Sequence, residues 1–159
     1  MLDEEVRIRP AEPEEAELLS DVAWRSKEYW EYPVDMMSHF RDFLTITDDF
    51  IEKNPTYLAE NEETGEIIGF YSIELLDDFK WWIRHLWVVP ERIGTGVGGE
   101  LFLHACEIAE TVGADELNII ADPNVEEFYL HMGAEKIGEK TQKTGGVDRK
   151  LPVLLIRLH

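Results

Sequence analysis

The sequence has one cysteine, few basic residues and no long apolar run. Cys106 is the only cysteine among 159 residues, which excludes an internal disulfide and a zinc site built from several cysteines. No apolar run reaches the ~18 residues that a membrane span requires. The acidic start, residues 1–5, lacks the basic and then apolar order of a signal peptide. These absences predict a soluble, cytoplasmic protein with no membrane partner.

Basic residues are scarce, because 15 Lys and Arg stand against 34 Asp and Glu, for a formal net charge of −19 at pH 7. Phosphate backbones are bound by clustered Lys and Arg, so we expect no nucleic-acid partner. Residues 1–79 carry 6 basic and 22 acidic side chains, whereas residues 80–159 carry 9 and 12. An anionic ligand is therefore expected on the second half and a cationic one near the first. The alternative is an acidic surface that serves solvation, as in a saline cytoplasm.

Hydrophobic periodicity predicts one α/β domain over residues 1–159. Leu18, Leu19, Val22, Ala23 and Ser26 form the inner face of a helix that begins near residue 12 and ends before Pro33. Further helices are expected at 34–44, with a continuation at 47–52, directly after Gly99, and at 123–132. Strands are expected at 6–9, 56–60, 66–75, 79–89, 117–121, 134–139 and 151–158. This order predicts a central mixed, mostly antiparallel sheet of six or seven strands flanked by about four helices.

A glycine-rich segment, residues 94–99, separates a predicted strand from a predicted helix. Glycines let backbone N–H groups approach phosphate oxygens, and the positive end of the following helix faces them. The segment lacks the Gly-Lys-Ser/Thr of a P-loop. It matches the dinucleotide pattern G-x-G-x-x-G, but it follows an antiparallel hairpin and too few residues remain for two mononucleotide-binding halves. A loop that only turns the chain is the structural alternative.

Two motifs carry a resemblance to a known family. Residues 86–101, LWVVPERIGTGVGGEL, resemble the acetyl-CoA signature of the GNAT superfamily of N-acetyltransferases. Asp122-Pro123-Asn124 followed by FYLHMGA at 128–134 resembles the second motif of that family. The resemblance covers nearly the whole chain and implies a GNAT-like α/β (α+β) domain. It implies direct transfer of an acetyl group from acetyl-CoA, without a metal, to a primary amine of a small molecule or peptide. The alternative is a GNAT-fold acyl-CoA-binding sensor or scaffold without transferase activity.

The resemblance also implies how CoA would be held. Its pyrophosphate would lie on Gly94, Thr95, Gly96, Val97, Gly98 and Gly99, with Arg92 as a side-chain aid. Backbone groups of Leu86, Trp87 and Val88 would pair with the pantetheine arm. Relatives often carry Gln or a basic residue where Ile93 and Thr95 stand here, so phosphate binding would rest mainly on backbone amides. The 3′-phosphate needs a separate basic partner, and the candidates are Lys136, Lys140, Lys143, Arg149 and Lys150, unless these form a solvated face.

Candidate catalytic groups are fewer. Tyr129 matches the tyrosine that protonates the CoA sulfur in the family, and a backbone N–H near Val88 would bind the oxyanion. The base is Glu74, His85 or water, because Trp82 stands where relatives place an acid or histidine, and alternation turns His85 to the other face of the strand. Asp122 is expected to be a helix N-cap, which leaves Asn124 as the candidate CoA contact. Cys106 is expected to pack, and the five histidines show no metal spacing.

Aromatic residues are frequent where the acceptor is expected. The substrate pocket is predicted between the first two helices and the hairpin, framed by Trp24, Tyr29, Trp30, Tyr32, Trp81 and Trp82. The negative charge of the first half favours a cationic acceptor amine. A homodimer is left open by the sequence.

Overall fold

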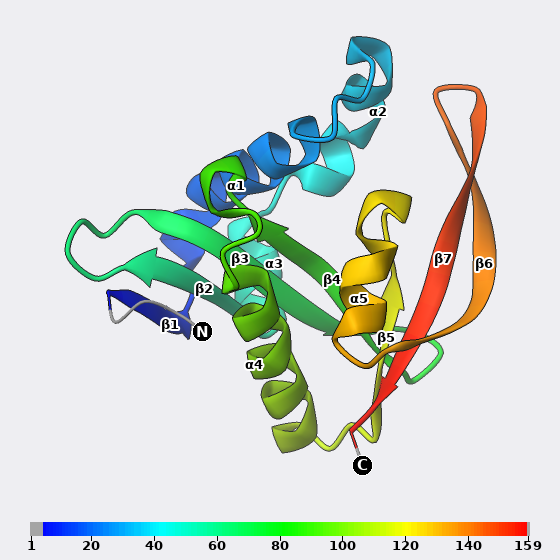
Figure 1. Ribbon diagram of the computed structural model, residues 1–159. Helices are drawn as coiled ribbons and strands as arrows, with labels where there is room; N and C mark the ends of the chain where they lie inside the picture. Colours follow the sequence, from blue (N-terminus) through cyan, green and yellow to red (C-terminus); the bar gives the residue numbers. More distant parts are fainter. Residues whose placement is uncertain (1–4, 159) are drawn as a thin grey trace.

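The computed structural model describes residues 5–158, which form a seven-stranded mixed sheet with helices packed against it (Figure 1). The strand order is β1-β2-β3-β4-β5-β7-β6. All neighbouring strands are antiparallel except β4 and β5, which are parallel. The strands are β1 (Val6–Pro10), β2 (Thr56–Asn61), β3 (Ile67–Leu75), β4 (Trp81–Val88), β5 (Glu116–Ile120), β6 (Glu135–Thr144) and β7 (Val147–Arg157). The expected sheet of six or seven strands is confirmed.

Helices cover both faces of this sheet. They are α1 (Ala16–Glu28), α2 (Val34–Leu44), α3 (Asp48–Lys53), α4 (Val97–Thr111) and α5 (Glu126–His131), with the short 3-10 turns η1 (Pro13–Glu15), η2 (Pro90–Arg92) and η3 (Pro123–Val125). Tyr71 of β3 meets α4, where its Oη lies 2.6 Å from Nδ1 of His104. The next residue, Ser72, pairs with His85, whose ring lies 4.8 Å from that of Phe43 in α2. Because adjacent strand residues point to opposite faces, α4 covers one face and α1 to α3 cover the other (Figure 1).

The helices differ from expectation in two places. The helix at 34–44 does not continue, because Thr47 begins α3 as a new N-cap whose side chain accepts a hydrogen bond from the N–H of Phe50. In α1 the expected inner residue Leu18 is exposed, whereas Lys27 is buried with Leu19 and Ala23. The inner face of α1 therefore includes Lys27 and not Leu18, which means that the helix is rotated about its axis relative to the expectation.

The last two strands are longer than expected and form a projecting hairpin (Figure 1). We call residues 139–150 the β6–β7 arm. Its turn uses Gly145 and Gly146, both with positive φ, a two-residue turn that suits the twist of a hairpin. A Cβ built at Gly145 would lie 2.9 Å from Cδ2 of His39, so the tip of the arm touches α2. The sequence did not indicate these strand ends because the arm is polar on both faces and shows no apolar alternation.

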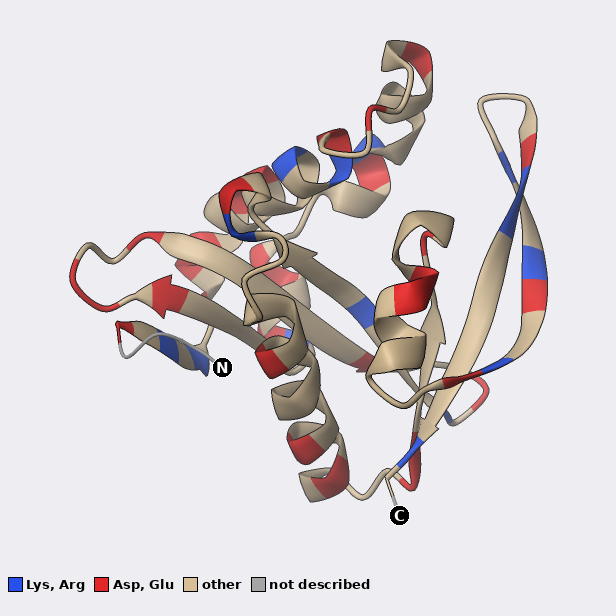
Figure 2. Cartoon of the chain, viewed as in Figure 1, with Lys and Arg blue, Asp and Glu red and all other residues tan. Residues whose placement is uncertain are grey.

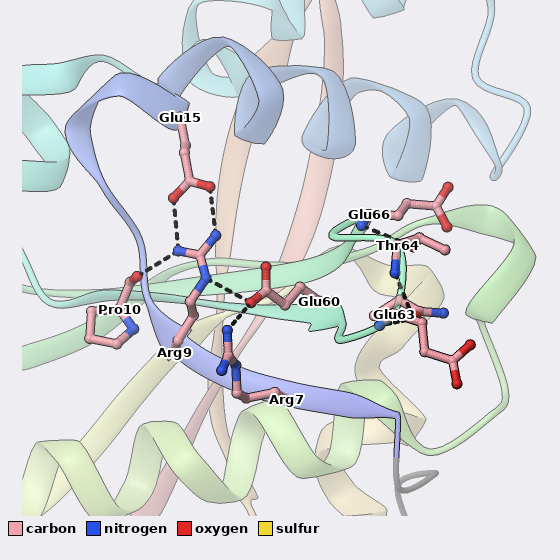
Figure 3. A network of polar contacts seen from close by, with 9 residues as sticks. Arg7, Arg9, Pro10, Glu15, Glu60, Glu63, Thr64 and Glu66 are labelled. Atoms are coloured by element: carbon pink, nitrogen blue, oxygen red, sulfur yellow. Dashed lines mark hydrogen bonds and ion pairs between the residues drawn. The ribbon is translucent and has the colours of Figure 1, made fainter.

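A network of charged side chains connects the strands at the other edge of the sheet (Figure 3). Glu60 of β2 accepts hydrogen bonds from Arg7 and Arg9 of β1 at 2.7 and 3.0 Å. Arg9 also donates to both carboxylate oxygens of Glu15, at 3.0 and 2.8 Å. The hydrogen bonds from Arg9 and then from Arg7 hold the pKa of Glu60 below its ordinary value, and the charges of the two arginines add to this effect. This network ties β1, β2 and the start of α1 together, at the opposite edge of the sheet from β6 and β7.

A β-bulge interrupts the pairing of β3 with β4. Ser72 pairs with His85 and Ile73 pairs with Ile83, so Arg84 is the extra residue. Trp82 pairs with Glu74. Because Ser72 and Glu74 lie on one face of β3, His85 and Trp82 also share a face. The expectation that His85 points away from Trp82 is wrong, since the bulge shifts the alternation by one residue.

Candidate active site

The two parallel strands at the centre of the sheet separate after a short contact. Trp82 pairs with Asn118 and Ile83 with Ile119, and within residues 5–158 no further pairing joins β4 to β5. The side-chain amide of Asn118 donates to the carbonyl of Trp81 at 3.1 Å at the joined end. The following residues of β4, Leu86, Trp87 and Val88, pair with β3 on one side only. Their other backbone edge is open to a ligand that runs between β4 and β5.

The glycine segment lies beyond this open edge and forms the start of α4. Gly96 is the N-cap residue with φ 98° and ψ −7°, and Gly94 has φ 86°, so both positions require glycine. No acceptor within the described residues takes a hydrogen bond from the amides of Gly96, Val97, Gly98 or Gly99. The hydroxyl of Thr95 instead donates to the carbonyl of Arg92 at 2.6 Å. The helix begins as a ring of unpaired amides that suits a phosphate group.

Tyr129 lies in α5, on the same side of the molecule as α4. Its ring packs edge-to-face on Phe102 and Phe128, with centroids 5.6 and 5.1 Å apart. Burial raises the pKa of its hydroxyl, so Tyr129 stays protonated at neutral pH. Within residues 5–158 no protein group is recorded as a hydrogen-bond partner of that hydroxyl. Its proton is therefore free to be donated to a ligand, the property required of a general acid.

A buried charged cluster, which the sequence analysis did not predict, lies at the separated ends of the strands. Asp122, which follows β5, accepts from Nζ of Lys27 at 2.5 Å and from Oη of Tyr32 at 2.6 Å. It is also the expected N-cap of η3, since its Oδ1 accepts from the N–H of Asn124 at 2.8 Å. Burial alone would raise the pKa of Asp122, but the charge and hydrogen bond of Lys27 outweigh it and lower the pKa. Asp122 is thus ionised.

Arg149 of β7 completes this cluster. Its Nη2 donates to Oη of Tyr32 at 3.0 Å and lies 3.9 Å from Oδ2 of Asp122. The guanidinium lies 5.1 Å from the ring centroid of Phe40, and Nζ of Lys27 lies 4.4 Å from the same ring. We call Lys27, Tyr32, Asp122, Asn124 and Arg149 the Asp122 cluster. It joins α1, β5, η3 and the β6–β7 arm around the opening beside β4.

The sequence contained part of the signal for this cluster. Lys27 follows Leu19 and Ala23 at intervals of four residues, so helical periodicity already places it on the inner face of α1. A lysine at such a position calls for a buried carboxylate. Asp122 is 95 residues away in sequence, however, and its N-cap role accounted for it locally.

The structure argues against His85 as the base. Its Nδ1 accepts a hydrogen bond from the indole N–H of Trp87 at 2.9 Å, so the neutral ring carries its proton on Nε2. Burial, with a smaller contribution from the charge of Arg84, lowers the pKa of His85 to about 3. The carboxylate of Glu74 forms an ion pair with Arg84, because its Oε1 lies 3.7 Å from Nε of that residue. Water stays as the third candidate from the sequence.

The basic residues proposed for the 3′-phosphate do not form one cluster. Lys136 contacts Glu126 and Glu139 at 3.6 and 3.3 Å, and Lys143 contacts Asp148 at 3.8 Å. Arg149 belongs to the Asp122 cluster. Lys140 and Lys150 lie exposed on the β6–β7 arm, and no acidic partner is recorded for them within residues 5–158. Figure 2 shows basic positions on this arm and acidic positions along α4.

Three of the aromatic residues expected around the substrate lie in two different places. Tyr32 belongs to the Asp122 cluster, and Trp24 in α1 lies 4.6 Å from the guanidinium of Arg41 in α2. Trp24, Tyr32 and Arg41 line a cavity of about 220 Å³ between these helices. Trp82 instead lies at the start of β4, where its indole N–H donates to Asp78 at 3.2 Å.

Residues 5–158 hold no candidate metal site and no candidate membrane-spanning helix. No group of three or more His, Cys, Asp or Glu side chains there could hold a metal ion. No described helix has both the length and the apolar character to cross a membrane.

Comparisons with known proteins identify the family. The Acetyltransferase (GNAT) family model matches residues 17–134. The GCN5-related N-acetyltransferase of Rhodopseudomonas palustris has a similar structure, with a TM-score of 0.81, 21% identity, and coverage of 99% of this chain and 98% of that chain. PaiA N-acetyltransferase of Thermoplasma acidophilum, in complex with coenzyme A, gives 0.72 at 20% identity over 96% and 98% of the chains. YncA of Salmonella typhimurium, with its cofactor acetyl-CoA, gives 0.71 at 17% identity over 98% and 95%. No curated protein sequence matches significantly. The chain belongs to the GNAT family of acetyltransferases.

Proposed function

We propose that the chain is an N-acetyltransferase that moves the acetyl group of acetyl-CoA to a primary amine of a small molecule or peptide. The observation that carries this proposal is the open edge of β4, which leads to the unpaired amides at the start of α4. An extended pantetheine chain can pair with such an edge as a strand would, and a pyrophosphate suits the helix start. Relatives solved with CoA or acetyl-CoA support the same ligand.

Direct transfer needs few protein groups. The neutral amine attacks the carbonyl carbon of the thioester, the new C–N bond forms, and the C–S bond breaks. A backbone N–H near Val88 stabilises the oxyanion, and Tyr129 donates its proton to the leaving thiolate. The surplus proton of the amine passes to water, which then reprotonates Tyr129 through solvent. The products are an amide and free CoA thiol.

The test follows thiol release from acetyl-CoA in the presence of a panel of primary amines, with mass spectrometry of the products. We expect thiol release that depends on both substrates and yields the acetylated amine. Binding of acetyl-CoA without transfer to any amine would instead support an acyl-CoA sensor or scaffold. Absence of acetyl-CoA binding would contradict both functions.

A further inference from the structure

The Asp122 cluster lies at the place where an acceptor must approach. Trp87, whose backbone edge is open, has its ring 5.9 Å from Nζ of Lys27. Asp122 and Asn124 follow the other separated strand, β5, and Tyr129 comes from the helix directly after them. The cluster therefore spans the opening from β4 to β5, on the face covered by α1 and α2. The inference below rests on the proposed function and specifies its acceptor.

The hydrogen-bonding capacity of the cluster is unbalanced. Asp122 is already occupied, because it accepts from Lys27, Tyr32 and the side chain and backbone of Asn124. Two basic side chains thus surround one carboxylate, and Lys27 takes the short contact. Arg149 is left with one hydrogen bond, to Tyr32, although a guanidinium has five N–H donors and stays charged in proteins. No other acidic side chain within residues 5–158 is recorded as its partner.

Burial makes this imbalance informative. The side chain of Arg149 is only 11% exposed. Charged groups in such surroundings are normally paired closely, because leaving water is costly, whereas Arg149 shares the Asp122 carboxylate with Lys27 at a distance of 3.9 Å. The rings of Tyr32 and Phe40, 5.3 and 5.1 Å from the guanidinium carbon, hold it in place rather than neutralise it. The arm that carries Arg149 is itself anchored, because its tip at Gly145 contacts His39.

We propose that the acceptor is an amine that carries a carboxylate, and that Arg149 binds this carboxylate. The planar guanidinium matches the two oxygens of a carboxylate, and it is positioned by its hydrogen bond to Tyr32, which in turn donates to Asp122. The local charge here differs from the acidic first half of the sequence, which predicted a cationic acceptor. At the short distances of a buried site the nearest charges outweigh exposed ones, which salt screens over about 8 Å. The acceptor class is therefore an amino acid or a close analogue.

The experiment compares matched acceptors. Alanine, methionine, phenylalanine and glutamate are each assayed beside the corresponding carboxamide, which keeps the amine and removes the charge. We expect kcat/KM for at least one acid to exceed that of its amide by about tenfold or more, equivalent to about 1.4 kcal/mol. In Arg149→Gln this preference disappears through a raised KM for the acid, while kcat/KM for the amide and KM for acetyl-CoA change less than about twofold. Arg157→Gln, an exposed arginine on the same strand, is the matched control and keeps the preference.

Three outcomes would overturn the inference. Equal use of acids and amides by the wild type removes the carboxylate from recognition. An equal loss for acids and amides in Arg149→Gln makes the residue structural. A raised KM for acetyl-CoA alone assigns Arg149 to a CoA phosphate. Arg149→Lys, which keeps the charge and loses the planar fork, replaces Arg149→Gln if the latter does not fold, and a partial loss of the acid preference is expected for it.

A binding measurement separates this inference from the proposed function. N-acetylalanine and the other acetylated acids of the panel are titrated onto the protein with CoA present, and the melting temperature is followed. We expect stabilisation of the wild type and of Arg157→Gln, but not of Arg149→Gln. Absence of stabilisation by every acid overturns the carboxylate site. Stabilisation without thiol release from any amine keeps the site and contradicts transferase activity alone.

Discussion

Nζ of Lys27 lies 2.5 Å from Oδ2 of Asp122, although 95 residues separate them in sequence, and each side chain is only 8% exposed. Burial lowers the pKa of Lys27, and the charge and hydrogen bond of Asp122 offset only part of this effect. The contact connects the first helix to the end of β5. It therefore holds together two parts of the chain that lie on either side of the proposed acceptor opening.

Replacing Asp122 with Asn should destabilise the protein strongly. An amide keeps the shape but leaves Lys27 and Arg149 buried without a negative partner, and breaking a buried ion pair in this way typically costs about 3–5 kcal/mol. Urea unfolding measures the change. Asp148→Asn, at an exposed ion pair with Lys143, is the control and should change the free energy of unfolding by less than about 1 kcal/mol. Adding Lys27→Met to Asp122→Asn should recover part of the loss, and no recovery would show that the pair is not coupled.

Gly96→Asp should abolish the stabilisation of the protein by acetyl-CoA. A ligand at a hundredfold excess over its Kd stabilises the folded state by about 2.7 kcal/mol, which a thermal melt detects. The aspartate would repel phosphate and strain a position with φ 98°. Gly65→Asp imposes comparable strain at φ 76° in the β2–β3 turn, far from α4, and should keep the ligand effect. An unchanged acetyl-CoA shift in Gly96→Asp would remove the glycine segment from the proposed site.

Tyr129→Phe should lower turnover by about 10²–10⁴-fold, the usual contribution of a general acid, with little change in acetyl-CoA affinity. The ring keeps its contacts with Phe102 and Phe128, so the fold should be retained. Steady-state kinetics and a binding titration give the two quantities. Tyr57→Phe removes a hydroxyl from β2 and serves as the control. Equal rates for Tyr129→Phe and the wild type would make Tyr129 a packing residue.

His85 predicts a pH dependence of stability. Its pKa is about 3 in the folded protein because of burial, whereas an unfolded histidine titrates near 6.5. The unfolded chain therefore binds more protons below pH 6.5, and stability falls as the pH falls. Between pH 6.5 and 5 the loss reaches about 2 kcal/mol. Melting temperatures from pH 7 to 5 should fall less steeply in His85→Gln, whose amide oxygen can still accept from Trp87. An equal fall of the melting temperature in His85→Gln and the wild type would show that His85 does not cause the loss of stability.

The sequence predicted the sheet, the glycine segment and the family because each depends on local pattern. Gly94 and Gly96 have the positive φ that glycine permits, and Asp122 caps η3 as its position before Pro123 indicated. The placement of the site residues next to one another depends on the sheet order instead. One backbone edge of residues 86–88 is open, because β5 lies beside β4 but pairs with it only as far as Ile83. The roles assigned to these residues stay predictions.

Other features depended on contacts that no local pattern records. The bulge at Arg84 adds one residue to a strand of aromatic and apolar residues, and the alternation gave no sign of it. Arg149 stood among four lysines in sequence and looked like part of a solvated or phosphate-binding face. Its burial arises because the β6–β7 arm folds back against α2, so its partners are Tyr32 and Phe40.

The short junction of β4 and β5 has a consequence for hydrogen exchange. Within residues 5–158 only Trp82–Asn118 and Ile83–Ile119 pair across it, so the half-sheet β1–β4 and the half-sheet β5, β7 and β6 share few backbone bonds. Regions joined in this way can open separately, at a lower free energy than global unfolding. We expect amides of β5 to exchange before those of β3 in the free protein. A ligand paired with the edge of β4 would slow exchange on both sides of the junction together.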